Sequence, residues 1–128
     1  MSERLDKLRK IMKEKGFDAF LVTSAENHLY FSGFNNPDGC LLIFPDCAVA
    51  FEDFRYTEAA KRAVSKDDFQ VVMPTGKRSS WLGEALHIAS AHTVAFEDDC
   101  VTCRELKQLK KDCRGAEELL RRYVEEAA

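Results

Sequence analysis

The chain has 128 residues, of which 32% are charged and 45% hydrophobic, and its formal net charge is −3. The length is that of one domain with one hydrophobic core, and the composition is typical of a globular protein. The small net charge comes without a basic patch or an acidic run, which excludes a nucleic-acid-binding surface and a solvating tail.

The apolar segments and the cysteines indicate where the protein works. The longest apolar runs, at 19–22 and 40–44, are too short to span a bilayer, and the charged N-terminus lacks the apolar segment of a signal peptide. Five cysteines, an odd number without a secretory context, are typical of reduced thiols rather than of a disulfide framework. These features predict a cytoplasmic protein.

Helices and strands alternate along the predicted chain. Apolar residues recur at helical spacing in the opening segment, and short apolar runs between turn signals predict the strands. The first half of the sequence predicts a helix ending at Gly16, a strand over 17–23, a helix capped by Ser24 and ending near Gly33, and paired strands over 40–44 and 47–51. The second half predicts a helix over 56–64, a strand over 69–73, a helix over 81–91 capped by Ser80, and a strand over 93–96. A last helix is opened by the capping box Thr102–Glu105.

This order predicts an α/β fold with a mixed β-sheet and flanking helices. Strands separated by helices favour parallel pairs, and the hairpin at Pro45 adds an antiparallel one. The last segment differs in kind, because residues 117–127 place apolar side chains, from Leu119 to Ala127, on one helical face. Such a stripe requires a partner, so it either docks on its own domain or leads into a further segment.

The histidines and glycines form no self-contained catalytic motif. His87 and His92 are five residues apart, which does not fit a zinc site with two ligands on one helical turn, so we expect no metal site in this chain. The loop over 75–80 lies between a strand and a helix but lacks the first glycine of a P-loop, which favours a solvated loop.

Cys100 and Cys103 form a C-x-x-C pair ahead of a predicted helix, a setting that lowers the pKa of a thiol. The acidic residues at 97–99 act in the opposite direction, and a zinc ribbon requires a second such pair. A thiol-based enzyme is therefore one alternative, and incidental cysteines are the other.

Residues 53–56 are the most informative cluster, because they lie where a strand passes into a helix. At such a junction Asp53 can cap the helix, and Arg55 can project towards a ligand or partner. In the alternative interpretation Arg55 pairs with Asp53 or Glu58 and Tyr56 packs. The residues alone favour neither.

Four segments follow one another in a specific order. The first is an opening helix and strand over 4–23. The second, residues 26–34 (ENHLYFSGF), is similar to the pattern N-x-x-Y-x-[ST]-G-[FY]. The third, residues 51–60 (FEDFRYTEAA), is similar to a D-x-R-Y junction, and the fourth, residues 114–119 (RGAEEL), to a K-S-x-E-E-[IL] helix start. Together they resemble the amino-terminal domain of the creatinase/prolidase family, which includes proline dipeptidase and Xaa-Pro aminopeptidase. The sequence departs from the family at Phe54, where a small residue is usual, and at 114–116.

The resemblance implies an α/β domain with a ribonuclease H-like sheet, at 1–113, followed at 114–128 by the start of a linker helix to a catalytic domain. In the family that domain binds two divalent metals, commonly manganese, through two Asp, one His and two Glu, and none of these ligands can be assigned to this chain. No catalytic residue is therefore expected here. Arg55 matches an arginine that reaches towards bound substrate, and the further candidates at the substrate entrance are Tyr56, Asp53, His28 and Tyr30.

We therefore expect the non-catalytic amino-terminal domain of a metal-dependent Xaa-Pro dipeptidase or aminopeptidase, a hydrolase. Its expected partners are its own C-terminal catalytic domain, a second copy in a homodimer and an Xaa-Pro peptide, with no nucleic acid and no membrane. The alternative is a stand-alone binding or oligomerisation module that kept the fold and lost the enzyme.

Overall fold

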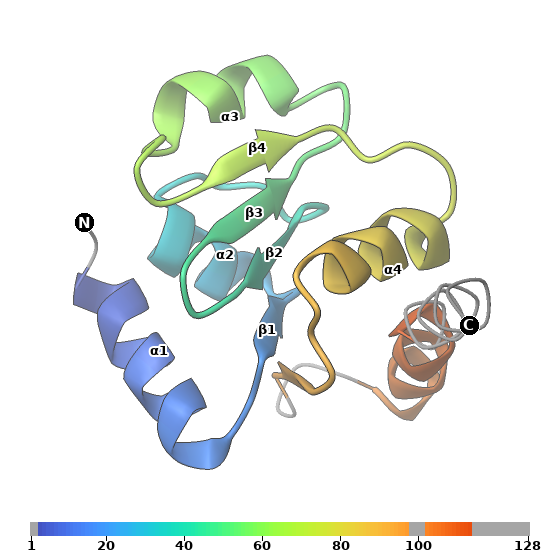
Figure 1. Cartoon of the computed structure of the whole chain (residues 1–128). Helices are drawn as coiled ribbons and strands as arrows, with labels where there is room; N and C mark the ends of the chain where they lie inside the picture. Colours follow the sequence, from blue (N-terminus) through green and yellow to red (C-terminus); the bar gives the residue numbers. More distant parts are fainter. Residues whose placement is uncertain (1–2, 98–101, 114–128) are drawn as a thin grey trace. The chain divides into compact units, whose positions relative to one another are not determined.

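A five-stranded mixed sheet organises the larger part of the molecule (Figure 1). The computed structural model describes residues 3–97 and 102–113. Its elements are α1 (Glu3–Lys15), β1 (Ala19–Val22), α2 (Ala25–Ser32), β2 (Cys40–Ile43), β3 (Ala48–Phe51), α3 (Thr57–Ala63), β4 (Gln70–Val72), α4 (Arg78–Ile88) and β5 (Val94–Phe96), and a further helix covers 103–113. The α/β class and the mixed sheet predicted from the sequence are confirmed.

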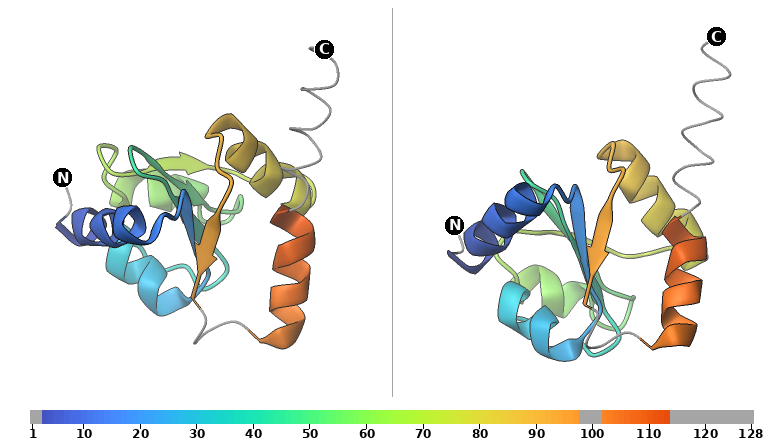
Figure 2. Two further views of the ribbon diagram at one scale, coloured as in Figure 1. Left: turned by 60° about the horizontal axis from the view of Figure 1, so that its bottom comes forward. Right: turned by 90° about the horizontal axis from the view of Figure 1, so that it is seen from below.

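The described residues divide into two compact units. The first holds 3–74 and 93–97 and contains the whole sheet; the second holds 75–92 and 102–113. The strand order is β4-β3-β2-β1-β5, with antiparallel pairs β1–β2 and β2–β3 and parallel pairs β1–β5 and β3–β4. Helices α1, α2 and α3 lie on the same face of this sheet (Figure 2).

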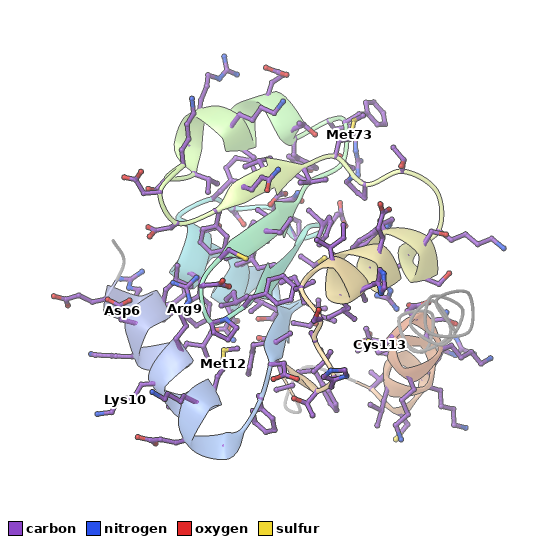
Figure 3. All side chains as sticks on the ribbon, viewed as in Figure 1. Asp6, Arg9, Lys10, Met12, Met73 and Cys113 are labelled. Atoms are coloured by element: carbon purple, nitrogen blue, oxygen red, sulfur yellow. The ribbon has the colours of Figure 1, made fainter. Side chains whose placement is uncertain are left out.

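The core of the first unit follows from the two periodicities of its elements. Alternate strand residues point to the helix-covered face, and Leu41 and Ile43 of β2 pair with the small Ala50 and Ala48 of β3. From α1, Leu5 and Met12 pack into the same cluster. Figure 3 shows Met12 and Arg9 on the sheet side of α1, whereas Asp6 and Lys10 point away. Arg9 Nε donates to the Phe44 carbonyl at 2.8 Å.

Local capping signals fix several helix ends as predicted. The Ser24 hydroxyl accepts from the Asn27 N–H, and α2 ends at Gly33, which has a φ of 76°. The Thr102 hydroxyl accepts from the Glu105 N–H at 3.1 Å. In the second unit the helix at 103–113 is tied to α4 by an ion pair of 2.5 Å between Arg78 Nε and Asp112 Oδ2.

One predicted helix start is wrong. Helix α4 begins at Arg78, three residues before the predicted start at Trp81, so Ser80 lies within its first turn and does not cap it. The capping position is Lys77, which makes no side-chain cap, and the Ser80 N–H donates to the Lys77 carbonyl at 2.9 Å. Ser80 resembled a cap because serine is favoured there, but a helix can begin wherever its first amides reach other partners.

The predicted linker helix at 114–128, with its apolar stripe from Leu119 to Ala127, lies outside the described residues. Within the described part of the chain, no helix combines the length and the apolar character that crossing a bilayer requires.

Gly33→Ala is expected to destabilise the protein by about 1 kcal/mol, because the left-handed backbone at this C-cap is strained for a residue with a Cβ. No atom lies within 4 Å of a Cβ built at Gly33, so a steric clash does not contribute. Gly33→Asn is the matched control and should lose less, since asparagine tolerates this conformation. Equal losses in urea unfolding for both variants would contradict this explanation.

Candidate functional site

The turn between β3 and α3 places Arg55 on the surface between two carboxylates. Asp53 Oδ1 accepts from the Arg55 backbone N–H at 3.0 Å, and Arg55 Nη2 donates to Asp53 Oδ2 at 2.8 Å and to Asp38 Oδ2 at 3.4 Å. We call Arg55, Asp53 and Asp38 the Arg55 cluster. The side chain of Arg55 is 55% exposed, so it is held in place and still reaches solvent.

The two charges at this turn stabilise each other. The side-chain hydrogen bond from Arg55 holds the pKa of Asp53 below its ordinary value, and the same contact with Asp53 raises the pKa of Arg55. Both groups therefore stay ionised over the whole physiological range, and the guanidinium keeps a fixed orientation.

The side chain of Asp53 does not cap helix α3, although the sequence suggested that it could. Its side chain bonds to Arg55, and helix α3 begins at Thr57 after Tyr56, which makes no side-chain cap. The Asp53 carbonyl instead accepts from the N–H groups of Tyr56 and Thr57, at 3.0 and 2.9 Å. The expected pairing of Arg55 with Asp53 is present, and Asp38 is its second acidic partner in place of Glu58.

Tyr56 packs beneath the Arg55 cluster. Its ring meets that of Phe34 edge-on, with centroids 6.4 Å apart, and Arg55 lies 5.4 Å from the Tyr56 ring centroid. Phe34 in turn lies 6.4 Å from the His28 ring. These edge-on and tilted contacts connect Arg55 to the residues behind it by a row of rings.

Behind the turn lies a buried polar network of Glu52, His28 and Asn36, which we call the Glu52 network. All three side chains have 0% exposure. His28 Nε2 lies 2.5 Å from Glu52 Oε1, and Asn36 Nδ2 donates to Glu52 Oε2. Both carboxylate oxygens are therefore occupied, as a buried carboxylate requires.

The hydrogen bonds of His28 determine where its protons lie. Nδ1 is 2.8 Å from the Phe34 carbonyl oxygen, which can only accept, so Nδ1 carries a hydrogen. A second hydrogen must lie between Nε2 and Glu52 Oε1, because two lone pairs would repel at 2.5 Å. The pair thus shares one proton and has no net charge in the interior.

The structure separates the predicted site residues into groups. Asp53, Arg55 and Tyr56 come together at the surface, and His28 lies directly behind them, buried and out of reach of a ligand. Tyr30 belongs elsewhere, because its ring lies under Arg4 of α1, 4.3 Å from the guanidinium carbon, and its carbonyl accepts from Arg4 Nη1.

Glu97, which follows β5, fastens the start of α2. Its carboxylate accepts from the N–H groups of Thr23 and Ser24 and from the side chains of Ser24 and Asn27, at 2.5–3.0 Å. Burial raises the pKa of Glu97, but these hydrogen bonds outweigh burial and hold the pKa below its ordinary value.

Sequence reasoning missed Glu52, Asn36 and Glu97 as site-forming residues. Glu52 directly follows an apolar strand next to Asp53, and nothing in the adjacent residues marks it as buried. Asn36 lies in a segment rich in turn-forming residues, 35–39, which indicates a loop and no more. The one available signal was the lone His28 on the helix ahead of them, since a buried histidine needs partners.

Potential metal ligands do not gather among the described residues, and two of the described thiols have raised pKa values. Across 3–97 and 102–113, no three His, Cys, Asp or Glu side chains come together to hold a metal. Burial and Asp46 raise the pKa of Cys47, and burial and Asp112 raise that of Cys113. Cys100, half of the C-x-x-C pair, lies outside the described residues.

Glu97→Gln is expected to lower the free energy of unfolding at pH 7 by about 1–2 kcal/mol, because hydrogen bonds to an ionised group are lost. The ordinary pKa of this carboxyl is 4.5 and the folded value lies below it. Its stabilisation is therefore complete above about pH 4.5 and is lost as the pH falls through the lower folded value. Urea unfolding at pH 7 and pH 3 should show the difference from wild type shrinking, and the exposed Glu84→Gln should show none at either pH.

Gly39→Ala is expected to destabilise the protein by about 1–3 kcal/mol through overpacking. An added Cβ would lie 2.5 Å from Glu52 Oε2 and 3.0 Å from His28 Nε2, and both atoms are already locked by hydrogen bonds. A thermal unfolding midpoint equal to that of wild type would show that the Glu52 network can shift freely.

Comparisons with known proteins identify the family of the chain and match its fold. The family model of the creatinase/prolidase N-terminal domain matches residues 4–121. An uncharacterized peptidase of Bacillus subtilis, YqhT, is 31% identical over 99 residues, which are 77% of this chain and 28% of that protein. The N-terminal domain of the cytoplasmic peptidase PepQ from Mycobacterium tuberculosis superposes with a TM-score of 0.77 at 30% identity, over 90% of this chain and 88% of that one.

An Xaa-Pro aminopeptidase from Streptococcus pyogenes gives a TM-score of 0.77 at 28% identity, over 88% of this chain and 84% of that structure. The chain thus spans less than a third of the curated relative YqhT but most of these two solved structures. It belongs to the creatinase/prolidase N-terminal domain family.

Proposed function

We propose that this chain is the non-catalytic N-terminal domain of a metal-dependent Xaa-Pro peptidase and that it supplies one wall of the substrate entrance, centred on Arg55. The single observation that carries the proposal is the Arg55 cluster: a guanidinium fixed by two carboxylates and still exposed to solvent. Supporting it are the family match and the relatives named as Xaa-Pro aminopeptidases.

The chemistry of the cluster suits a peptide. Within the described residues the hydrogen bonds of Arg55 use its backbone N–H, Nε and Nη2, which leaves the two N–H groups of Nη1 to a ligand. Two carboxylates against one guanidinium leave the cluster net negative. It therefore suits the carbonyl oxygen of a peptide bond better than a free anion.

The reaction itself is proposed to lie in the C-terminal catalytic domain of the full-length protein. Two divalent metals, expected to be manganese, would supply an activated water there. The role of this chain would be to position the peptide and to contribute to a homodimer in the cytoplasm. No step of the chemistry is assigned to the residues of this chain.

In the full-length protein, Arg55→Ala is expected to raise KM for an Xaa-Pro peptide about tenfold with kcat little changed, because a hydrogen bond from a charged group to the bound peptide is lost. Arg55→Lys should recover only part of the loss, since an ammonium lacks the planar fork. Steady-state kinetics with saturating manganese provide the measurement.

Lys61→Ala, on the exposed surface of α3, is the control and should match wild type. An unchanged KM in Arg55→Ala would contradict the placement of Arg55 at the substrate. Cleavage of an Xaa-Pro dipeptide by the metal-loaded 128-residue chain alone would contradict the non-catalytic assignment.

A further inference from the structure

We propose that Glu52 is a positioning residue for the Arg55 cluster and that it acts through Asn36 and the loop at 34–39. The inference rests on the proposed role of Arg55 at the substrate entrance. Glu52 itself is wholly buried, so its side chain is not available to a peptide at the surface. Its effect would pass from the interior to the surface along hydrogen bonds that can be followed one at a time.

The first link is the side-chain amide of Asn36. Its Oδ1 accepts from the Asp38 backbone N–H at 3.0 Å, and its Nδ2 donates to Glu52 Oε2. Because the oxygen is committed to an N–H group, the orientation of the amide is determined and cannot be reversed without losing both bonds. The backbone at Asp38 is thereby held at a fixed place relative to Glu52.

The second link holds the other end of the same loop. Glu52 Oε1 bonds to His28 Nε2, and His28 Nδ1 donates to the carbonyl of Phe34. The loop also lies directly on the carboxylate, since a Cβ at Gly39 would be 2.5 Å from Glu52 Oε2. One buried carboxylate therefore holds the loop at Asn36 directly and at Phe34 through His28, and it lies close against the loop at Gly39.

The third link reaches the surface. The loop carries Asp38, whose carboxylate is a partner of Arg55 Nη2 at 3.4 Å, and Asp53, the other partner, follows Glu52 directly in the chain. The Glu52 side chain thus places Asp38 through the loop, and the second acidic partner of Arg55 is the next residue in the chain. The row of rings from His28 through Phe34 to Tyr56 supports the same guanidinium from below.

A space-filling role would not need a carboxylate. Burying a charged or polar group costs free energy that an apolar side chain of similar size avoids. What the carboxylate adds is a pair of hydrogen bonds that hold their partners in a fixed orientation. In the Glu52 network both oxygens are used, and both contacts lead to the loop that carries Asp38.

The test compares Glu52→Gln with Glu52→Leu in the full-length protein. The introduced glutamine amide can accept from Asn36 and donate to His28 Nε2, because His28 carries its hydrogen on Nδ1 in the neutral form. The introduced leucine fills similar space without either contact. We expect KM for an Xaa-Pro peptide within about twofold of wild type for Glu52→Gln and about three- to tenfold higher for Glu52→Leu, the scale of one or two lost hydrogen bonds. Asn36→Ala should behave like Glu52→Leu and decides the test if the leucine variant does not fold.

Coupling distinguishes positioning from a general loss of structure. If Glu52 acts through Arg55, the double variants Glu52→Leu/Arg55→Ala and Asn36→Ala/Arg55→Ala should have the KM of Arg55→Ala alone. Multiplied KM effects in the double variants, or an unchanged KM in folded Asn36→Ala, would overturn the positioning proposal while leaving the role of Arg55 intact. An unchanged KM in Arg55→Ala itself would overturn the proposed function instead, and Lys61→Ala again serves as the neutral control.

Discussion

The contact between Glu52 and His28 is the interaction on which the surface features of the first unit depend. It joins the end of β3 to the middle of α2 and lies beneath the loop that connects α2 to β2. A buried carboxylate and an imidazole that share one proton form a neutral unit, so they can be packed among apolar residues without an uncompensated charge. Removing either partner would leave the facing atom of the other buried without a hydrogen-bond partner. Substitution of either residue should therefore cost more stability than substitution in a surface ion pair.

Much of the fold could be predicted because its signals are local. The C-cap at Gly33 and the N-caps at Ser24 and Thr102 depend on neighbouring residues only, and the strands follow from short apolar runs. The predicted start of α4 was wrong because the prediction used a local signal, the serine at position 80, as the helix cap. The helix starts earlier, at Arg78, and has no side-chain cap that the sequence could reveal.

The candidate site was only partly predictable. Arg55, Asp53 and Tyr56 are adjacent in the sequence, so their joint appearance at a strand-to-helix junction was visible without a structure. The Glu52 network was not, because it joins residues that are 16 and 24 positions apart. Nothing in the neighbourhood of an acidic residue reveals whether the fold will bury it, and only the register of β2 against β3 brings the loop at 34–39 over Glu52.

The hydrogen bonds between Glu97 and the start of α2 have a consequence for the order in which the domain forms. Strand β5 pairs with β1 across more than 70 residues, and the carboxylate that binds the first turn of α2 arrives only at its end. While the chain is being synthesised, β1 therefore remains an open edge next to a helix start with unpaired amides until residue 97 has emerged. Contacts over such sequence separations form late and slowly. Before they do, the nascent chain exposes a strand edge that can pair with other chains.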